Sequence, residues 1–173
     1  MIKRYIILMA IGVFFAASLS NAQGIQDGYG KMTLPDGSVY EGQFKDGVFE
    51  GKGTQTYPNG DKYQGDFSGG KFDGNGRVDY ADGRQYIGGF KYGLYEGKGV
   101  LLYTDQSKYE GEFKEGLLHG QGTLTYADGG TYTGQFKYGD LNGQGTLTYS
   151  DGSKDKGRFK DGGVDTRYPG DSA

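Results

Sequence analysis

Hydrophobic and polar positions alternate with a period of two along short stretches of this chain. In Tyr109-Glu110-Gly111-Glu112-Phe113 the aromatic and glycine positions alternate with acidic ones, and in Gly122-Thr123-Leu124-Thr125-Tyr126 the glycine, leucine and tyrosine alternate with threonines. This alternation predicts β-strands, because successive side chains of a strand point to opposite faces. We expect two such strands, joined by a connection over 114–120 and followed by a tight turn at Ala127-Asp128-Gly129.

The pattern of these two strands recurs every 23 residues, with no insertion or deletion between the copies. Five full units run over 39–153, with a half unit at 23–38 before them and a half unit at 154–163 after them. A fixed period of this kind is typical of an array in which each unit buries its apolar face against its neighbours. The sequence therefore predicts an all-β fold, an elongated single-layer antiparallel meander of repeated 23-residue hairpins.

The unit resembles the MORN motif (membrane occupation and recognition nexus), whose pattern is close to Tyr-x-Gly-x-Phe, a gap, Gly-x-Gly and a final aromatic residue before Asp-Gly. The likeness covers residues 28–163. The resemblance implies a twisted antiparallel sheet with a grooved face that serves in attachment or assembly, sometimes in contact with phospholipid, and is not catalytic. The chain departs from the pattern at Asp155, which replaces a tyrosine, and at Gln106, which replaces the turn glycine. Asp155 is interpreted as a polar end cap, and Gln106 puts the turn of the third unit in doubt.

The two ends of the chain do not follow the repeat. Residues 1–22 have a basic start, an apolar run and small residues before Gln23, which predicts a signal peptide cleaved after Ala22, with a membrane anchor as the alternative. Residues 164–173 form a tail. Removing 1–22 leaves 17 basic and 22 acidic residues, a net charge of about −5, which argues against binding to nucleic acid. We expect an exported protein, periplasmic or extracellular, with association to the envelope as a further expectation.

Few residues offer catalytic or metal chemistry. His119 is the one histidine and there is no cysteine, so a histidine relay and the usual transition-metal sites are excluded, and no cofactor is expected. Glu110 and Glu112 are the closest acidic pair on one strand face, and are interpreted as solvated. A ladder of acidic or amide residues is interpreted as closing turns through the side chains and not as binding calcium; its members are Asp36, Asn59, Asp82, Asp105, Asp128 and Asp151.

Three surfaces are candidates for binding. The first is an aromatic groove, suited to stacking of a peptide, a carbohydrate or a second copy of the chain, although its rings could equally form the core: Tyr40, Phe44, Tyr63, Phe67, Tyr86, Phe90, Tyr109, Phe113, Tyr132 and Phe136. The second is a basic edge for anionic lipid or polysaccharide, with a solvated edge as the alternative: Lys45, Lys91, Lys114, Lys137 and Lys160. The third is an apolar back patch, which we expect at Ile87, Val100 and Leu102 on the otherwise polar face.

These observations predict an exported, non-enzymatic binding and assembly module. Its expected partners are a protein or a second copy of the chain, with anionic lipid or polysaccharide as further candidates. The alternative function is a carbohydrate-active or other hydrolytic enzyme that uses surface carboxylates.

Overall fold

A computed structural model of the protein describes residues 27–165, and all regular structure within that range is β-strand. The described chain forms two compact units, one that ends at Leu94 and one that begins at Tyr95. Each unit is described by itself. The predicted signal peptide and most of the predicted tail lie outside the described residues.

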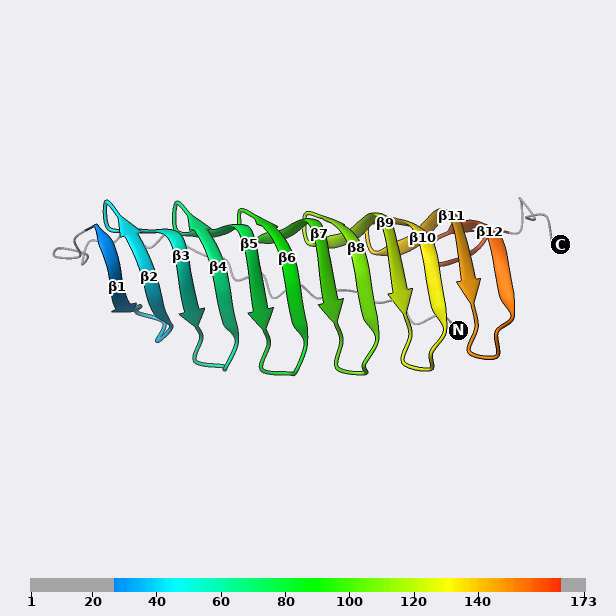
Figure 1. Cartoon of the computed structure of the whole chain (residues 1–173), viewed down its shortest axis with the longest axis horizontal. Coiled ribbons are helices and arrows are strands. Elements are labelled where there is room, and N and C mark those ends of the chain that lie inside the picture. The colour runs from blue at the N-terminus through cyan, green and yellow to red at the C-terminus, as the bar shows by residue number, and fades with distance from the viewer. Residues whose placement is uncertain (1–26, 166–173) are drawn as a thin grey trace. The chain divides into compact units, whose positions relative to one another are not determined.

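Both units are antiparallel sheets in which each strand pairs with the strands before and after it in the sequence (Figure 1). The N-terminal unit consists of β1 (Gly28–Thr33), β2 (Val39–Lys45), β3 (Val48–Thr56), β4 (Lys62–Ser68), β5 (Lys71–Asp79) and β6 (Gln85–Lys91). The C-terminal unit contains all of β7 (Leu94–Leu102) except its first residue, followed by β8 (Lys108–Lys114), β9 (Leu117–Thr125), β10 (Thr131–Lys137), β11 (Asp140–Thr148), β12 (Lys154–Lys160) and β13 (Gly163–Val164). The predicted all-β meander of hairpins is confirmed.

Two-residue turns join the first strand of each repeat to the second. Asp46 and Gly47 have φ of 50° and 72°, and Glu115 and Gly116 have φ of 50° and 80°. Positive φ at both central residues defines a type I′ turn, whose twist matches that of the flanking strands. The predicted connection over 114–120 is therefore wrong, because β9 begins at Leu117 directly after the turn.

A β-bulge lengthens the second strand of each hairpin. Between β2 and β3, Gly42 pairs with Gly53 and Phe44 pairs with Phe49, so one residue on β2 faces three on β3. Gly51 in this bulge has a φ of 64°, a left-handed conformation that favours glycine. The side-chain oxygen of Gln43 accepts a hydrogen bond of 2.8 Å from the N–H of Lys52 and so closes the bulge.

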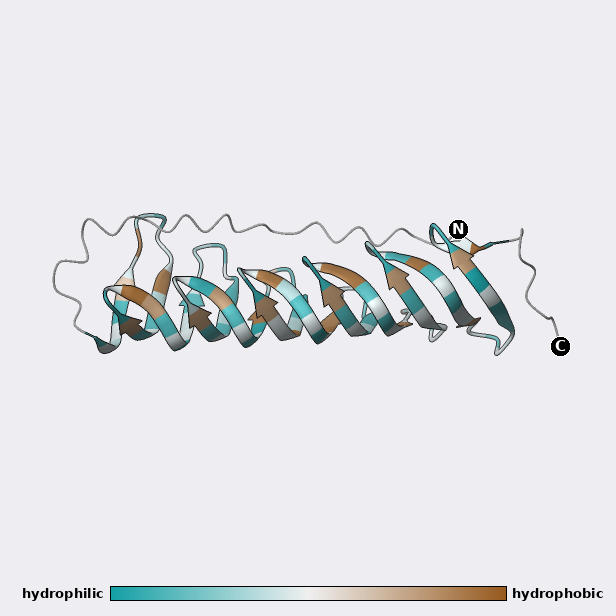
Figure 2. Cartoon of the chain, turned by 90° about the horizontal axis from the view of Figure 1, so that it is seen from above, coloured by the Kyte–Doolittle hydropathy of each residue, from teal (hydrophilic) through white to brown (hydrophobic). Residues whose placement is uncertain are grey.

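Aromatic rings on one face form the core of each unit. The ring of Tyr40 stacks on Phe49, with centroids 3.8 Å apart and an interplanar angle of 7°, and meets Phe44 edge-on at 5.0 Å. The Tyr40 hydroxyl donates a 2.7 Å hydrogen bond to the backbone oxygen of Gln43. A Cβ on Gly53 would lie 2.6 Å from this hydroxyl, so the ring requires glycine beneath it. Figure 2 shows hydrophobic and hydrophilic residues alternating along the strands that carry this core.

Longer loops join one repeat to the next, and a side chain closes each of them. Asp36 Oδ1 accepts the N–H of Ser38 at 2.9 Å, and Asn59 Oδ1 accepts the N–H of Asp61 at 3.0 Å. Asp82, Asp105, Asp128 and Asp151 accept the N–H two residues later in the same way. The prediction that this ladder closes turns is confirmed.

Gln106 occupies the glycine position of one of these loops. It has a φ of 69°, and its N–H donates a 3.1 Å hydrogen bond to the carbonyl of Tyr103, the same bond that Gly129 makes to Tyr126 in the next repeat. The turn of the third unit is therefore kept, with a non-glycine residue in a left-handed conformation.

Candidate functional site

The ten residues of the predicted aromatic groove lie in the cores of their units. The five tyrosines are 0% exposed and the five phenylalanines are also buried. A ligand could stack on these rings only by displacing the side chains that cover them. The role of these residues in binding stays a prediction.

The five lysines of the basic edge end β2, β6, β8, β10 and β12, and all five are exposed. Ser68, which interrupts the ladder, ends β4. No ion pair to any of these lysines is formed by residues 27–165. The Nζ atoms of Lys91 and Lys137 lie over tyrosine rings, 5.8 Å from the centroid of Tyr92 and 5.7 Å from that of Tyr138. Binding of an anionic partner at this edge stays a prediction.

The three residues of the apolar back patch are divided between the two units. Ile87 lies on β6, pairs with Arg77 and is 50% exposed. Val100 and Leu102 lie on β7, where they pair with Glu110 and Lys108, and Leu102 is 37% exposed. Apolar surface is thus present at each position, and the continuous patch stays a prediction.

The acidic residues and the histidine are engaged in local structure. The carboxylate of Glu110 pairs with Lys108 at 3.2 Å, and that of Glu112 accepts the N–H of Gln121 at 3.1 Å. His119 is half-buried and its ring contacts that of Tyr138. Within residues 27–165, no three His, Cys, Asp or Glu side chains gather to hold a metal ion. The same range has no helix that is long and apolar enough to cross a bilayer.

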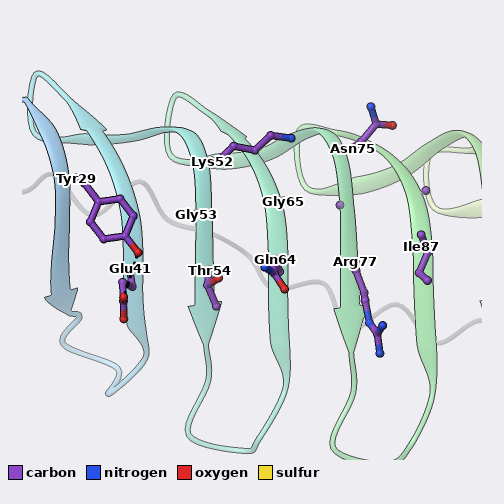
Figure 3. Close-up of a pocket in the computed structure, with 12 residues that line it drawn as sticks. Tyr29, Glu41, Lys52, Gly53, Thr54, Gln64, Gly65, Asn75, Arg77 and Ile87 are labelled. Carbon is purple, nitrogen blue, oxygen red and sulfur yellow. Dashed lines mark hydrogen bonds between the residues drawn. The ribbon is translucent and has the colours of Figure 1, made fainter.

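A groove crosses the polar face of the N-terminal unit. We call it the N-terminal groove; its volume is 640 Å³ and it reaches from Tyr29 on β1 to Ile87 on β6 (Figure 3). The backbone of paired glycines, among them Gly53 and Gly65, lies along its floor. Two rows of side chains flank this floor, because residues on either side of each glycine point to the polar face.

The charged side chains of the N-terminal groove are paired with one another or with neighbours. Lys52 pairs with Asp66 at 2.6 Å and Arg77 with Asp79 at 2.7 Å. Burial, the largest single effect, would raise the pKa of Asp66, but the hydrogen bond from Lys52, the hydrogen bond from the N–H of Asn75 and the charge of Lys52 together outweigh it, and the pKa is lowered. Asp66 is therefore a carboxylate at neutral pH and holds Lys52 beside the groove.

Glu41 is the third charged group of the N-terminal groove. It pairs with Lys31 at 3.5 Å and accepts a 3.1 Å hydrogen bond from the hydroxyl of Tyr29. This bond raises the pKa of Tyr29 and fixes the direction of its ring, which is 74% exposed.

A second groove, the C-terminal groove, crosses the polar face of the other unit. Its volume is 580 Å³, and its lining includes Lys98, Glu110, Glu112, Gln121 and Thr133. The two grooves occupy equivalent positions of the repeat and differ in their side chains. The C-terminal groove is lined by two carboxylates, whereas the N-terminal groove has one, Glu41, together with two amides and an exposed tyrosine.

Comparison with protein families agrees with the repeat. The MORN repeat matches six segments, which cover residues 22–39, 40–62, 63–83, 86–108, 109–131 and 132–154. The chain belongs to the MORN-repeat family. No curated protein matches this MORN-repeat chain with significance.

Comparison with solved structures finds similarity to two further domains. The TCP domain of SAS-4 from Drosophila melanogaster, solved in complex with a proline-rich motif of Ana2, is 15% identical, with a TM-score of 0.46, over 76% of this chain and 72% of that chain. The TCP10 domain of CPAP from Danio rerio is 17% identical, with a TM-score of 0.43, over 79% of this chain and 64% of that chain.

Sequence reasoning expected a groove on the aromatic face and missed both grooves of the polar face. It followed the aromatic columns, which the fold uses for its core, and interpreted the intervening polar residues as a solvated face. The sequence signal that could have revealed the grooves is a pair of glycine columns, which contain Gly42, Gly53 and the equivalent glycines of the other repeats. Their pairing across the strands, as in Gly42 with Gly53, forms the continuous floor of each groove.

Proposed function

We propose that this MORN-repeat protein is an exported, non-enzymatic binding and scaffold module that engages its partners through the polar face of its repeats. The observation that supports the proposal is that one face of each sheet is filled by its own side chains, whereas the other is open. The aromatic side chains are buried in the cores of the two units, whereas the polar face has an open groove of 640 Å³ in one unit and 580 Å³ in the other. Grooves of this size are typical of binding sites.

A capture experiment tests the scaffold role. The purified protein is used as bait for the exported fraction, beside a variant with Gln64→Glu and Thr133→Glu, which places a charge in each groove. Both residues are exposed, so we expect the variant to keep the thermal stability of the wild type. Partners that the wild type captures and the folded variant loses would support the proposal, and partners that both capture equally would contradict a role for the polar face.

Export is tested separately. We expect the native product to begin at Gln23, which N-terminal sequencing or intact-mass measurement would show. A product that stays in the cytosol and still begins at Met1 would contradict it.

Binding to an anionic surface is a second candidate function, favoured by the five exposed lysines of the basic edge, which form no ion pair with any residue in 27–165. Association with vesicles that contain anionic lipid, or with an acidic glycan, should fall as salt rises and should fall in the triple variant Lys91→Gln, Lys114→Gln and Lys137→Gln. Unchanged association in the triple variant would leave the basic edge as solvated surface.

The enzyme alternative is tested by turnover. The proposal expects no hydrolysis across a broad panel of glycans and esters. Turnover that is lost on Glu110→Gln or Glu112→Gln would favour the hydrolytic enzyme instead.

A further inference from the structure

We propose that the N-terminal groove binds a neutral, linear oligosaccharide. This inference deepens the proposed function and rests on it, because it names the ligand class of one of the two grooves.

The charge pattern selects an uncharged ligand. Each charged side chain of the groove already has an opposite charge beside it, as in Lys52 with Asp66 at 2.6 Å and Arg77 with Asp79 at 2.7 Å. An anionic or cationic ligand would have to compete with these pairs, and it would gain little at exposed positions. The groove therefore offers no unpaired charge to a charged ligand.

The polar, uncharged side chains of the groove suit the hydroxyl groups of a sugar. The side chains of Thr54, Gln64 and Asn75 line the groove, and none makes a side-chain hydrogen bond within residues 27–165. An amide presents both a donor and an acceptor, and each hydroxyl of a sugar is also both. Gln64 and Asn75 can therefore each bind a pair of neighbouring hydroxyls. Figure 3 shows Gln64 and Asn75 on neighbouring strands of the groove.

Apolar surface is available for the carbon-bearing faces of sugar rings. The ring of Tyr29, 74% exposed and held by Glu41, lies at one end of the groove, and Ile87, 50% exposed, lies at the other. The five steps between β1 and β6 span about 24 Å, which is the length of a linear oligosaccharide of several rings. The distance between the two apolar ends thus suits a chain of sugars better than a single one.

A peptide fits this groove less well. The backbone groups of the floor are paired within the sheet, as in Gly53 with Gly65 and Gly76 with Gly88, so an extended peptide cannot add to it as a strand. An amphipathic helix needs a row of apolar anchors, and the middle of the groove presents Thr54, Gln64 and Asn75 instead.

Isothermal titration calorimetry with the purified protein tests the proposal, with cellohexaose, chitohexaose and maltohexaose as probes. We expect at least one of them to bind, with an affinity that does not change as salt is raised. The double variant Gln64→Ala and Asn75→Ala removes two exposed amides and should weaken binding by about tenfold or more at unchanged thermal stability. Tyr29→Ala should weaken it as well.

The control is Gln121→Ala with Thr133→Ala, which removes two polar side chains from the C-terminal groove, Gln121 being the equivalent of Asn75, and should leave the affinity unchanged. Equal weakening by the control, or binding that disappears with salt, would overturn the proposal. Failure of all three probes would also overturn it. If the polar face still captures a partner in the bait experiment, only the ligand class has failed; if that capture fails too, the proposed function has failed with it.

Discussion

The ring of Tyr63 lies so close to the backbone of Gly76 that a Cβ atom there would be 2.5 Å from the ring's Cε2. The two residues sit on paired strands, β4 and β5. The Tyr63 hydroxyl donates a 2.7 Å hydrogen bond to the backbone oxygen of Asp66, and Phe72 stacks on the same ring at 3.6 Å. The ring is thus held in place by these contacts and cannot move away from the backbone of Gly76. The tyrosine column of the repeat therefore requires the glycine column.

We therefore expect Gly76→Ala to lower the free energy of unfolding by about 2 to 3 kcal/mol, since overpacking forces the ring from its place. Tyr63→Leu removes the obstructing ring and should cost about 2 to 4 kcal/mol by itself. In the double variant the added methyl group meets no ring. The double variant should lose less free energy of unfolding than the two single variants lose in sum, by more than about 1 kcal/mol, as urea denaturation would measure. Additive losses would show that the two residues are independent.

Much of this fold could be predicted from the sequence, because the 23-residue period and the alternation along Tyr109 to Phe113 report strands directly. The start of the second strand could not be predicted. The bulge at Gly120 adds two residues to β9 relative to β8, which breaks the alternation, and the sequence pattern therefore predicts a connection at Leu117 and Leu118. Leu118 is in fact 1% exposed and part of the core.

The candidate site was harder to predict than the fold. Gln64 and Asn75 are ordinary polar residues in the sequence, and only the pairing of β3, β4 and β5 brings them to one groove. Whether a polar side chain is free to bind a ligand depends on its neighbours across the sheet: Asp66 pairs with Lys52, whereas the side chain of Gln64 makes no hydrogen bond to any residue in 27–165.

Gln106 should be replaceable by glycine with a gain in stability. Its φ of 69° is a left-handed conformation that costs a residue with a Cβ about 1 kcal/mol or more, and glycine avoids this cost. We expect Gln106→Gly to raise the midpoint of urea denaturation. The reverse change in the next repeat, Gly129→Gln at a φ of 88°, should lower it. A destabilising effect of Gln106→Gly would mean that the glutamine side chain contributes a contact that outweighs its backbone strain.

The buried tyrosines make the fold sensitive to alkali. A tyrosine in the unfolded chain titrates near pH 10, whereas burial raises the pKa of Tyr40 and of Tyr132 to about 12, and also raises that of Tyr63 and Tyr109. Above pH 10 the unfolded chain therefore loses protons that the folded chain keeps. The stability contributed by these hydroxyls is intact below pH 10 and is lost as the pH rises toward 12.

Circular dichroism and phenolate absorbance, followed together during an alkaline titration, would check this expectation. The last tyrosines should ionise in the same pH interval in which the strand signal is lost. Tyr132→Phe, which cannot ionise, should flatten the pH dependence of stability above pH 10. Full phenolate absorbance with an intact strand signal would contradict the account.

His119 stands where other repeats place a carboxylate. Glu50 accepts the N–H of Gly69 at 3.0 Å, and Glu96 accepts the N–H of Glu115 at 3.1 Å, so that each acid binds the tip of the next hairpin. The equivalent tip residue for His119 is Tyr138. Within residues 27–165, the Nδ1 atom of His119 is buried without a hydrogen-bond partner.

His119→Glu should supply the missing acceptor and raise the free energy of unfolding by about 0.5 to 1.5 kcal/mol near neutral pH. His119→Ala is the control, because it also removes the ring contact with Tyr138 but adds no acceptor. Urea denaturation should rank the glutamate variant above the alanine variant, and hydrogen exchange at the Tyr138 amide should slow in the glutamate variant alone. Equal stability and equal exchange in the two variants would show that the carboxylates of this column contribute nothing to the hairpin tips.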